Sequence, residues 1–467
     1  MNLLKISLAN IKFKPLNALL SLLLLSFGVG LISLLIQIES QFNEQYHKNI
    51  DKIDLVLGAK GSALQLILSS VYQVDAPTGN IPLKTAKKIM KNMLVETSIP
   101  LAYGDNYKDY RIVGTTKDYS ELFETELKEG VLFEKSFDAC LGANVAKKTG
   151  LKIGDNFYSS HGLDYTESSE NDANEHVHDD HAFTVTGIFE ESGTVIDKVI
   201  ITSVKSLWDV HEGHDHEGHD DEEHDHSGHD HAEEEEHHEH EGHDHEGHEN
   251  HAAHDEQKEE KENLISAASL QSGTYLMKKE FENNEITASL LMFKKRSGQT
   301  SPAIGILPNM AEKVDLLTAL PAVEMKRLES QLGIGMKSMF WLGILITVIS
   351  FLSVFVSLYN SLKERKYEIA LMRTMGSSVG KIYSMILLEG LILSVLGFIL
   401  AMIFSRIGLW LVSSRIEEQF KFSFSDMSIL PYEWILLGIT LIVGALASFL
   451  PAISAVEKDI SKTLSNG

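Results

Sequence analysis

The sequence has a single cysteine, Cys140, among its 467 residues. One cysteine cannot build an internal disulfide framework or a cysteine-rich metal cluster. The chain also lacks the Gly-x-x-x-x-Gly-Lys-[Ser/Thr] motif, because Gly58-Ala-Lys-Gly-Ser62 does not have the spacing that wraps a phosphate. We therefore expect no nucleotide hydrolysis and no enzymatic activity on this chain.

Other catalytic and binding patterns are missing as well. No Gly-x-Ser-x-Gly, His-Glu-x-x-His or serine–histidine–aspartate order is present, and the basic residues form no nucleic-acid footprint. The acidity is local, because the segment from His211 to Glu262 holds 23 Asp and Glu against two Lys, a charge of −21 out of the chain's −25. The net charge therefore describes this segment and not the folded parts.

Apolar residues are concentrated in four runs of spanning length, which predict transmembrane helices over 16–38, 336–360, 382–405 and 432–455. A basic amphipathic stretch over 1–15 predicts an interfacial helix. The segment 361–381 is rich in Lys and Arg, whereas the loop 406–431 is balanced in charge. The segment 361–381 and the tail 456–467 are therefore predicted to be cytoplasmic, and the loop 406–431 is predicted to lie outside.

The membrane runs carry no chain of acids or bases, which argues against a proton or ion pathway. Glu389 is a single acid near the inner end of the third run, and we interpret it as a structural partner for a nearby Lys or Arg. The polar region 39–335 shows a helical pattern over 84–93 and strand-like alternation over 111–114, 183–188 and 198–202. The predicted fold class is a membrane α-helical protein with four transmembrane helices plus an extracytoplasmic α+β domain, interrupted by a disordered His-rich loop over 209–263.

Histidine is concentrated in the same acidic tract, with sixteen of the 21 residues between His211 and His254. Imidazoles alternate there with carboxylates, which is the ligand chemistry of Zn²⁺, and no apolar residues are present to order the chain. The alternative is a solvated acidic spacer, but a spacer needs charge and not imidazole. We expect low-specificity Zn²⁺ sites at His211, His214, His216, His219, His224, His226, His229, His231, His243, His245 and His248.

A second, ordered metal site is predicted at His161, His178 and His181, just before the strand-like segment 183–188. The alternative is that this loop is a small disordered extension. Beyond Zn²⁺ on the His-rich loop, no cofactor is expected on the chain.

The segment Arg365-Lys-Tyr-Glu-Ile-Ala-Leu-Met-Arg-Thr-Met-Gly376 lies between the second and third runs. A helix there can offer Ile369, Met372 and Met375 as apolar knobs to a groove, with Glu368 and Arg373 as orienting charges. A plain basic loop that only obeys the topology rules is the alternative. The sequence Leu387-Leu-Glu-Gly390 follows it into the third run.

Two further segments, Leu141-Gly-Ala-Asn-Val-Ala-Lys-Lys-Thr-Gly-Leu-Lys-Ile-Gly-Asp155 and Phe183-Thr-Val-Thr-Gly-Ile-Phe189, lie in the polar region. With the layout of one span, a large domain and three spans, these segments make the chain resemble the FtsX-like, MacB-type permeases of ABC transporters. The resemblance implies that Glu368, Ile369, Met372, Arg373, Met375 and Gly376 form the coupling segment for a separate cytoplasmic ABC ATPase that binds the ATP. It also implies a second permease copy or a paralogue, a MacB-like periplasmic core of two subdomains, and a multi-pass location in a bacterial inner membrane.

The leading functional hypothesis is a permease subunit that transmits ATP-driven motion to its outer domain to move or release an extracytoplasmic cargo, linked to zinc through the His-rich loop. The first alternative is a signalling or scaffold protein that relays this motion to a periplasmic partner enzyme. The second alternative is a metal-storage membrane protein without a motor.

Overall fold

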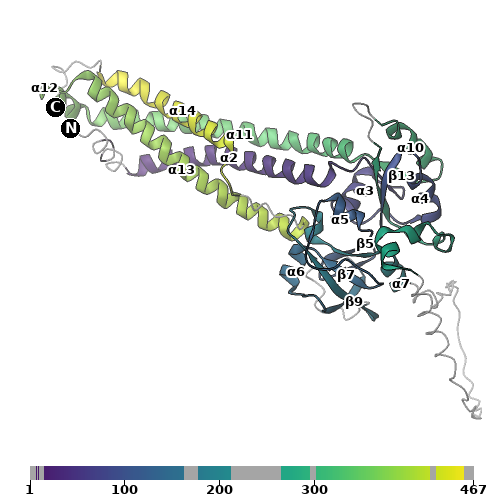
Figure 1. The fold of residues 1–467 in the computed structure, drawn as a ribbon. Coiled ribbons are helices and arrows are strands. Elements are labelled where there is room, and N and C mark those ends of the chain that lie inside the picture. The colour runs from purple at the N-terminus through teal and green to yellow at the C-terminus, as the bar shows by residue number, and fades with distance from the viewer. Residues whose placement is uncertain are drawn as a thin grey trace, which may run out of the picture. The chain divides into compact units, whose positions relative to one another are not determined.

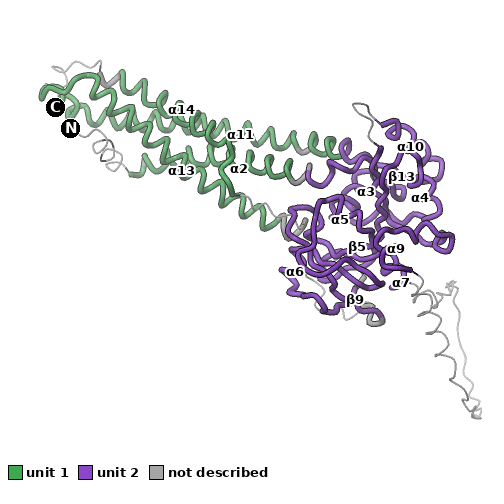
Figure 2. Tube along the Cα trace, viewed as in Figure 1, with its two compact units in different colours: residues 1–47, 325–467 green, residues 48–324 purple. Residues whose placement is uncertain are grey.

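The computed structural model describes residues 7, 9, 15–161, 177–211, 265–294, 301–420 and 427–456. The chain divides into two compact units, of which unit 1 comprises residues 1–47 and 325–467 and unit 2 comprises residues 48–324 (Figure 2). Residues 212–264 of the predicted loop and most of the predicted interfacial helix lie outside the described residues.

Unit 1 consists of long apolar helices (Figure 1). Within the described part of the chain, four helices are long and apolar enough to cross a membrane. They are α2 (Pro15–Ile50), α11 (Pro321–Glu364), α13 (Val379–Phe420) and α14 (Pro431–Val456), and the short helix α12 (Lys366–Thr374) joins α11 to α13. Together with the α+β architecture of unit 2, they confirm the predicted fold class for the described residues.

Several of these helices are longer than the predicted spans. A bilayer core needs about 20 helical residues, whereas α11 has 44 residues and α13 has 42. Residues 406–420, which were expected in the outer loop, therefore continue α13 as helix. Hydropathy marks where a helix leaves the hydrocarbon, but the Arg and Glu residues beyond that point also favour helix, so the helix does not end there.

Helices α13 and α14 approach each other at small residues. A Cβ atom added to Gly390 would lie 2.7 Å from Ser448 Cβ, and one added to Gly444 would lie 2.8 Å from Ser394 Cβ. Each helix thus places a Gly and a Ser four residues apart at the contact. This spacing is typical of membrane helices whose backbones pack closely.

A buried ion pair joins α2, α13 and α14. Arg406 donates from Nη1 to Glu433 Oε1 at 3.0 Å and from Nη2 to Glu433 Oε2 at 2.8 Å. The Ser33 hydroxyl donates to Glu433 Oε1 at 2.6 Å and lies 3.0 Å from Ser405 Oγ. The Glu433 side chain is fully buried, so these bonds replace its water.

Glu433 and Arg406, together with Gln37, also hold residues 428–430, which precede α14. Glu433 Oε2 accepts a hydrogen bond from the Leu430 backbone N–H at 3.0 Å, which is half of a capping box at the start of the helix. Arg406 Nη2 and Gln37 Nε2 both donate to the Ser428 carbonyl oxygen, at 2.9 Å and 3.0 Å. Since both charged groups are hydrogen-bonded, the cost of burying them is offset.

Unit 2 contains two sheets and a two-stranded ladder of β2 (Ile81–Pro82) and β11 (Glu285–Ile286). The first sheet is antiparallel and consists of β13 (Leu317–Ala319), β1 (Leu55–Gly58), β12 (Ala288–Phe293) and β3 (Val95–Leu101), in this order. Helices α3 (Ala63–Ser70), α4 (Leu83–Met90) and α10 (Ala303–Glu312) pack against it.

The second sheet has the order β6-β9-β7-β10-β5-β4-β8, and β8 also pairs with β9. Strand β9 has 13 residues, so its first half pairs with β8 and its second half with β7 and β6. Six strands therefore form a closed circuit of pairings. The strands are β4 (Asp105–Tyr107), β5 (Tyr110–Thr115), β6 (Leu127–Gly130), β7 (Asp138–Leu141), β8 (Asn156–His161), β9 (Val177–Phe189) and β10 (Ile200–Ser203).

Short helices complete unit 2. They are α5 (Asp118–Leu122), α6 (Ala143–Thr149), α7 (Val204–His211) and α9 (Ala267–Ser272), with 3₁₀ turns η1 (Val195–Lys198), η2 (Thr274–Met277) and η3 (Lys279–Phe281). The predicted helix and the first two predicted strands correspond to α4, β5 and β9. The third predicted strand begins only at Ile200, because the residues before Val199 form η1.

The chain segments on either side of residues 212–264 are packed against each other. The Lys205 backbone N–H donates to the Tyr275 hydroxyl at 2.9 Å, and the Trp208 ring stacks on Phe281 with their centroids 5.8 Å apart. The two segments that flank the His-rich tract are therefore held to each other within unit 2, and we call this packed pair the anchored base.

The ion pair predicts a specific pattern of stabilities. Arg406→Met leaves the buried Glu433 carboxylate uncompensated, so we expect it to cost roughly 3–5 kcal/mol of unfolding free energy. The double variant R406M/E433M removes both charges and should cost clearly less. The measurement is the thermal unfolding of the purified chain in detergent, with Lys381→Met, an exposed site on α13, as the control. If Arg406→Met were as stable as Lys381→Met, the ion pair would not have the stabilising role that we assign to it.

Candidate functional site

The predicted coupling segment forms helix α12 and the turn that follows it. The helix has one buried side, on which Ile369 and Ala370 are each only 5% exposed. Because α12 has just nine residues, packing and not intrinsic helix propensity holds it in place.

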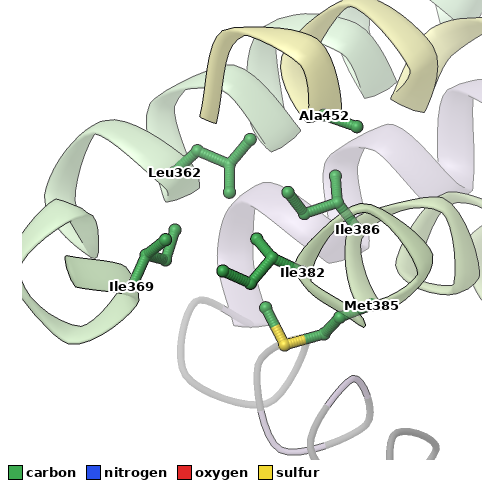
Figure 3. Close-up of a cluster of buried hydrophobic side chains, with 6 residues drawn as sticks. All are labelled: Leu362, Ile369, Ile382, Met385, Ile386 and Ala452. Carbon is green, nitrogen blue, oxygen red and sulfur yellow. The ribbon is translucent and has the colours of Figure 1, made fainter. Parts of the chain in front are cut away.

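Figure 3 shows where the buried side packs. Ile369 belongs to a cluster in which α11, α13 and α14 also take part, and Met372 packs against this cluster. The buried members are Leu362, Ile369, Ile382, Met385, Ile386 and Ala452. A movement of α12 would therefore act directly on three long helices.

The exposed side of α12 carries a different set of apolar residues. Tyr367, Leu371 and Met375 follow one another at intervals of four and are 53%, 46% and 79% exposed. Of the expected knobs Ile369, Met372 and Met375, only Met375 belongs to this exposed set, because Ile369 is buried in the cluster and Met372 packs against it. We call Tyr367, Leu371 and Met375 the apolar stripe.

Gly376 ends the helix by a backbone requirement. It has a φ of +94°, and no other atom lies within 4 Å of a Cβ added there. Its N–H donates to the Arg373 carbonyl oxygen at 3.1 Å. The Ser377 N–H donates to the Met372 carbonyl oxygen at 3.0 Å. This is the Schellman arrangement, which favours glycine because of its left-handed conformation.

The charged residues of the segment lie on its surface or at its start. Arg365 Nε donates to Glu368 Oε2 at 3.1 Å, and the Glu368 side chain is largely exposed. The Arg365 side chain is only 9% exposed, so the pair is partly buried, but the exposed part of Glu368 can still contact a partner. Arg373 is half-buried on the same helix.

Sequence reasoning missed the ion pair of Arg406 and Glu433. It placed Arg406 in a loop, although the residue lies within α13. One signal was present, since Ser33 and Gln37 in the first apolar run and Gln41 just after it recur at intervals of four. All three are buried, and Gln41 donates to Gln37 Oε1 at 3.2 Å. Glu389, the acid that was noticed, is also buried in α13.

The predicted metal ligands are mostly beyond the structural description. Every tract histidine from His214 to His248 lies outside the described residues, and the side chains of His161 and His178 are not described either. The His181 ring stacks on Phe137, with centroids 4.8 Å apart. Among the side chains that are described, no group of three or more potential metal ligands lies together, so the ordered site remains a prediction.

Comparison with solved structures finds 34 matching chains, of which two are described here. The chain is similar to the periplasmic region of MacB from Actinobacillus actinomycetemcomitans, at 8% identity and a TM-score of 0.31, over 61% of this chain and 95% of the other. It is also similar to a permease-protein domain from Porphyromonas gingivalis, at 11% identity and a TM-score of 0.24, over 59% and 88% of the two chains. Scores of this size do not establish a common fold, so the description of unit 2 depends on its own elements.

None of the curated proteins shows significant sequence similarity to the chain. The sequence model of the FtsX-like permease C-terminal family, however, matches residues 340–460. These residues include α12, the cluster beneath it, and both members of the ion pair. The match confirms the resemblance predicted from the segment ending at Gly376, and the C-terminal membrane region of this chain is similar to the C-terminal domain of FtsX-like permeases.

Proposed function

We propose that this chain is the membrane permease subunit of an ABC transporter system and that a separate cytoplasmic ATPase docks on the apolar stripe of α12. The observation that carries the proposal is the two-sided packing of this helix. Its inner side is buried in a cluster shared with three long helices, while Tyr367, Leu371 and Met375 remain exposed. An exposed stripe on a short helix suits a groove on a partner protein.

The long helices support transmission of the motion. Leu362 and Ile369 share one cluster, so a push on α12 acts on the end of α11. Helix α11 continues without a break from Glu364 back to Pro321, and this continuous helix is far longer than a bilayer requires. Displacement at the inner membrane face would thus be carried beyond the opposite face.

The proposed location is a bacterial inner membrane, with α12 in the cytoplasm and unit 2 in the periplasm. The Lys and Arg excess of the segment around α12 supports this orientation. A second copy of the chain or a paralogue completes the permease, and the cargo is extracytoplasmic.

We further propose that the His-rich tract binds Zn²⁺ and links the system to the handling of this ion. The support is the alternation of imidazole and carboxylate groups over residues 211–254. The anchored base at Trp208 and Phe281 would allow such a tract to be carried without disturbing the core.

A second candidate function is the relay of ATPase motion to a periplasmic partner enzyme. The polar groups buried in unit 1 favour a relay of motion over the passage of a cargo through the bilayer. Glu433 is fully buried and is bonded by Arg406 and Ser33, so its carboxylate does not face an open path.

Docking on α12 predicts site-specific cross-linking. A photoreactive benzoylphenylalanine in place of Leu371 should form an adduct with a protein that carries a nucleotide-binding motif, identified by mass spectrometry after irradiation of whole cells. The control places the same residue at Ile399, an exposed apolar position of α13, where lipid adducts are expected. Equal ATPase labelling from both positions, or none from position 371, would rule out the proposed docking face.

The tract predicts a change in zinc stoichiometry. Replacing residues 212–264 by a short Gly-Ser linker should at least halve the number of Zn²⁺ ions that the purified chain binds in calorimetry. The thermal midpoint should change little, because the flanking segments are packed independently of the tract. An unchanged stoichiometry in the folded variant would show that the tract is only a spacer.

A further inference from the structure

His211, the last residue of α7, turns one ring nitrogen toward a buried carboxylate. Its Nδ1 lies 2.7 Å from the Leu207 carbonyl oxygen. A carbonyl can only accept, so Nδ1 carries the hydrogen and donates it. The other nitrogen, Nε2, lies 3.6 Å from Oδ1 of Asp105, the first residue of β4.

The two partners differ in their access to solvent. The Asp105 side chain is 0% exposed, whereas that of His211 is 42% exposed. The second carboxylate oxygen, Asp105 Oδ2, accepts a hydrogen bond from Ser159 Oγ at 2.8 Å. The carboxylate is therefore held in place from within, and the imidazole borders on water.

The distance between Nε2 and Oδ1 matches that between two ligands of one metal ion. A charge-assisted N–H···O bond measures about 2.7–2.9 Å, so 3.6 Å is too long for one. Two ligands that each lie about 2.0–2.2 Å from Zn²⁺ are roughly 3.3–3.7 Å apart at angles from tetrahedral to 120°. A donor bond from the opposite ring nitrogen to a backbone carbonyl is also the usual outer contact of a metal-binding histidine.

We propose that Asp105 and His211 bind one divalent transition-metal ion of the zinc class at the base of the His-rich tract. Imidazole paired with carboxylate favours such an ion over Mg²⁺ or Ca²⁺, which prefer oxygen ligands alone. In the backbone register of β4 and β8, His161 stands directly opposite Asp105, so the same strand pair carries a further imidazole.

The described side chains supply two ligands to this site. It depends neither on ATPase docking at α12 nor on zinc binding by residues 212–264 of the tract, so it can fail while those proposals stand.

The test uses the full-length chain in detergent, stripped with chelator and titrated with Zn²⁺ by calorimetry. Asp105→Asn keeps an acceptor for Ser159, and His211→Gln changes a side chain that is partly exposed. Each variant should lose one zinc equivalent relative to the wild type, and the variant without residues 212–264 should retain that equivalent. The matched control is Glu96→Gln, which removes an exposed carboxylate of β3 and should bind as the wild type does.

Thermal unfolding separates the site from a simple ion pair. Zn²⁺ should raise the unfolding midpoint of the wild type and of Glu96→Gln, but not that of Asp105→Asn or His211→Gln, because a ligand stabilises only the state that binds it. Unchanged stoichiometry in both variants, or an equal zinc-induced shift in all proteins, would overturn the proposal. If Asp105→Asn does not fold, His211→Gln alone decides the outcome.

Discussion

A carboxylate inside an apolar helix bundle must be neutralised, and this constraint shapes unit 1. Glu433 stands in the first turn of α14 and is fully buried. Its two oxygens are bonded by Arg406 from α13, by Ser33 from α2 and by the Leu430 amide at the start of its own helix. Three helices must therefore meet at one point, because an unpaired charge there would cost several kcal/mol.

The opposite ends of these helices meet through apolar contacts. The cluster around Ile369 and Ile386 joins α12 to α11, α13 and α14 through apolar side chains. Between the two ends, Gly390 and Gly444 bring α13 and α14 into close backbone contact. The helices of unit 1 are thus held together by the ion pair near one end, by the apolar cluster near the other end and by the close contact of α13 with α14 between them. A packed interior does not yield easily, as the proposed transmission of displacement requires.

Unit 2 combines a closed core with tolerance for insertion. The long strand β9 closes the circuit of the second sheet, and buried rings such as Phe157 and Phe183 stack at a centroid distance of 5.5 Å within it. Arg111 donates to the Ser69 and Asp75 carbonyl oxygens, and burial lowers its pKa without making it neutral. Since these contacts do not involve the tract, a long polar insertion can be carried at the surface.

The sequence by itself determined the four membrane helices, the mixed character of unit 2, the histidine and acid content of the tract and the position of the segment that forms α12. Each depends on composition or on spacing along one element, such as an apolar run too long for a soluble helix. Tertiary structure decided which side of α12 is exposed, because its apolar residues surround much of the helix and only the cluster buries Ile369. It also decided the pairing of Arg406 with Glu433 and of His211 with Asp105. Ser33 and Glu433 are 400 residues apart, and no local pattern specifies which distant groups packing will bring together.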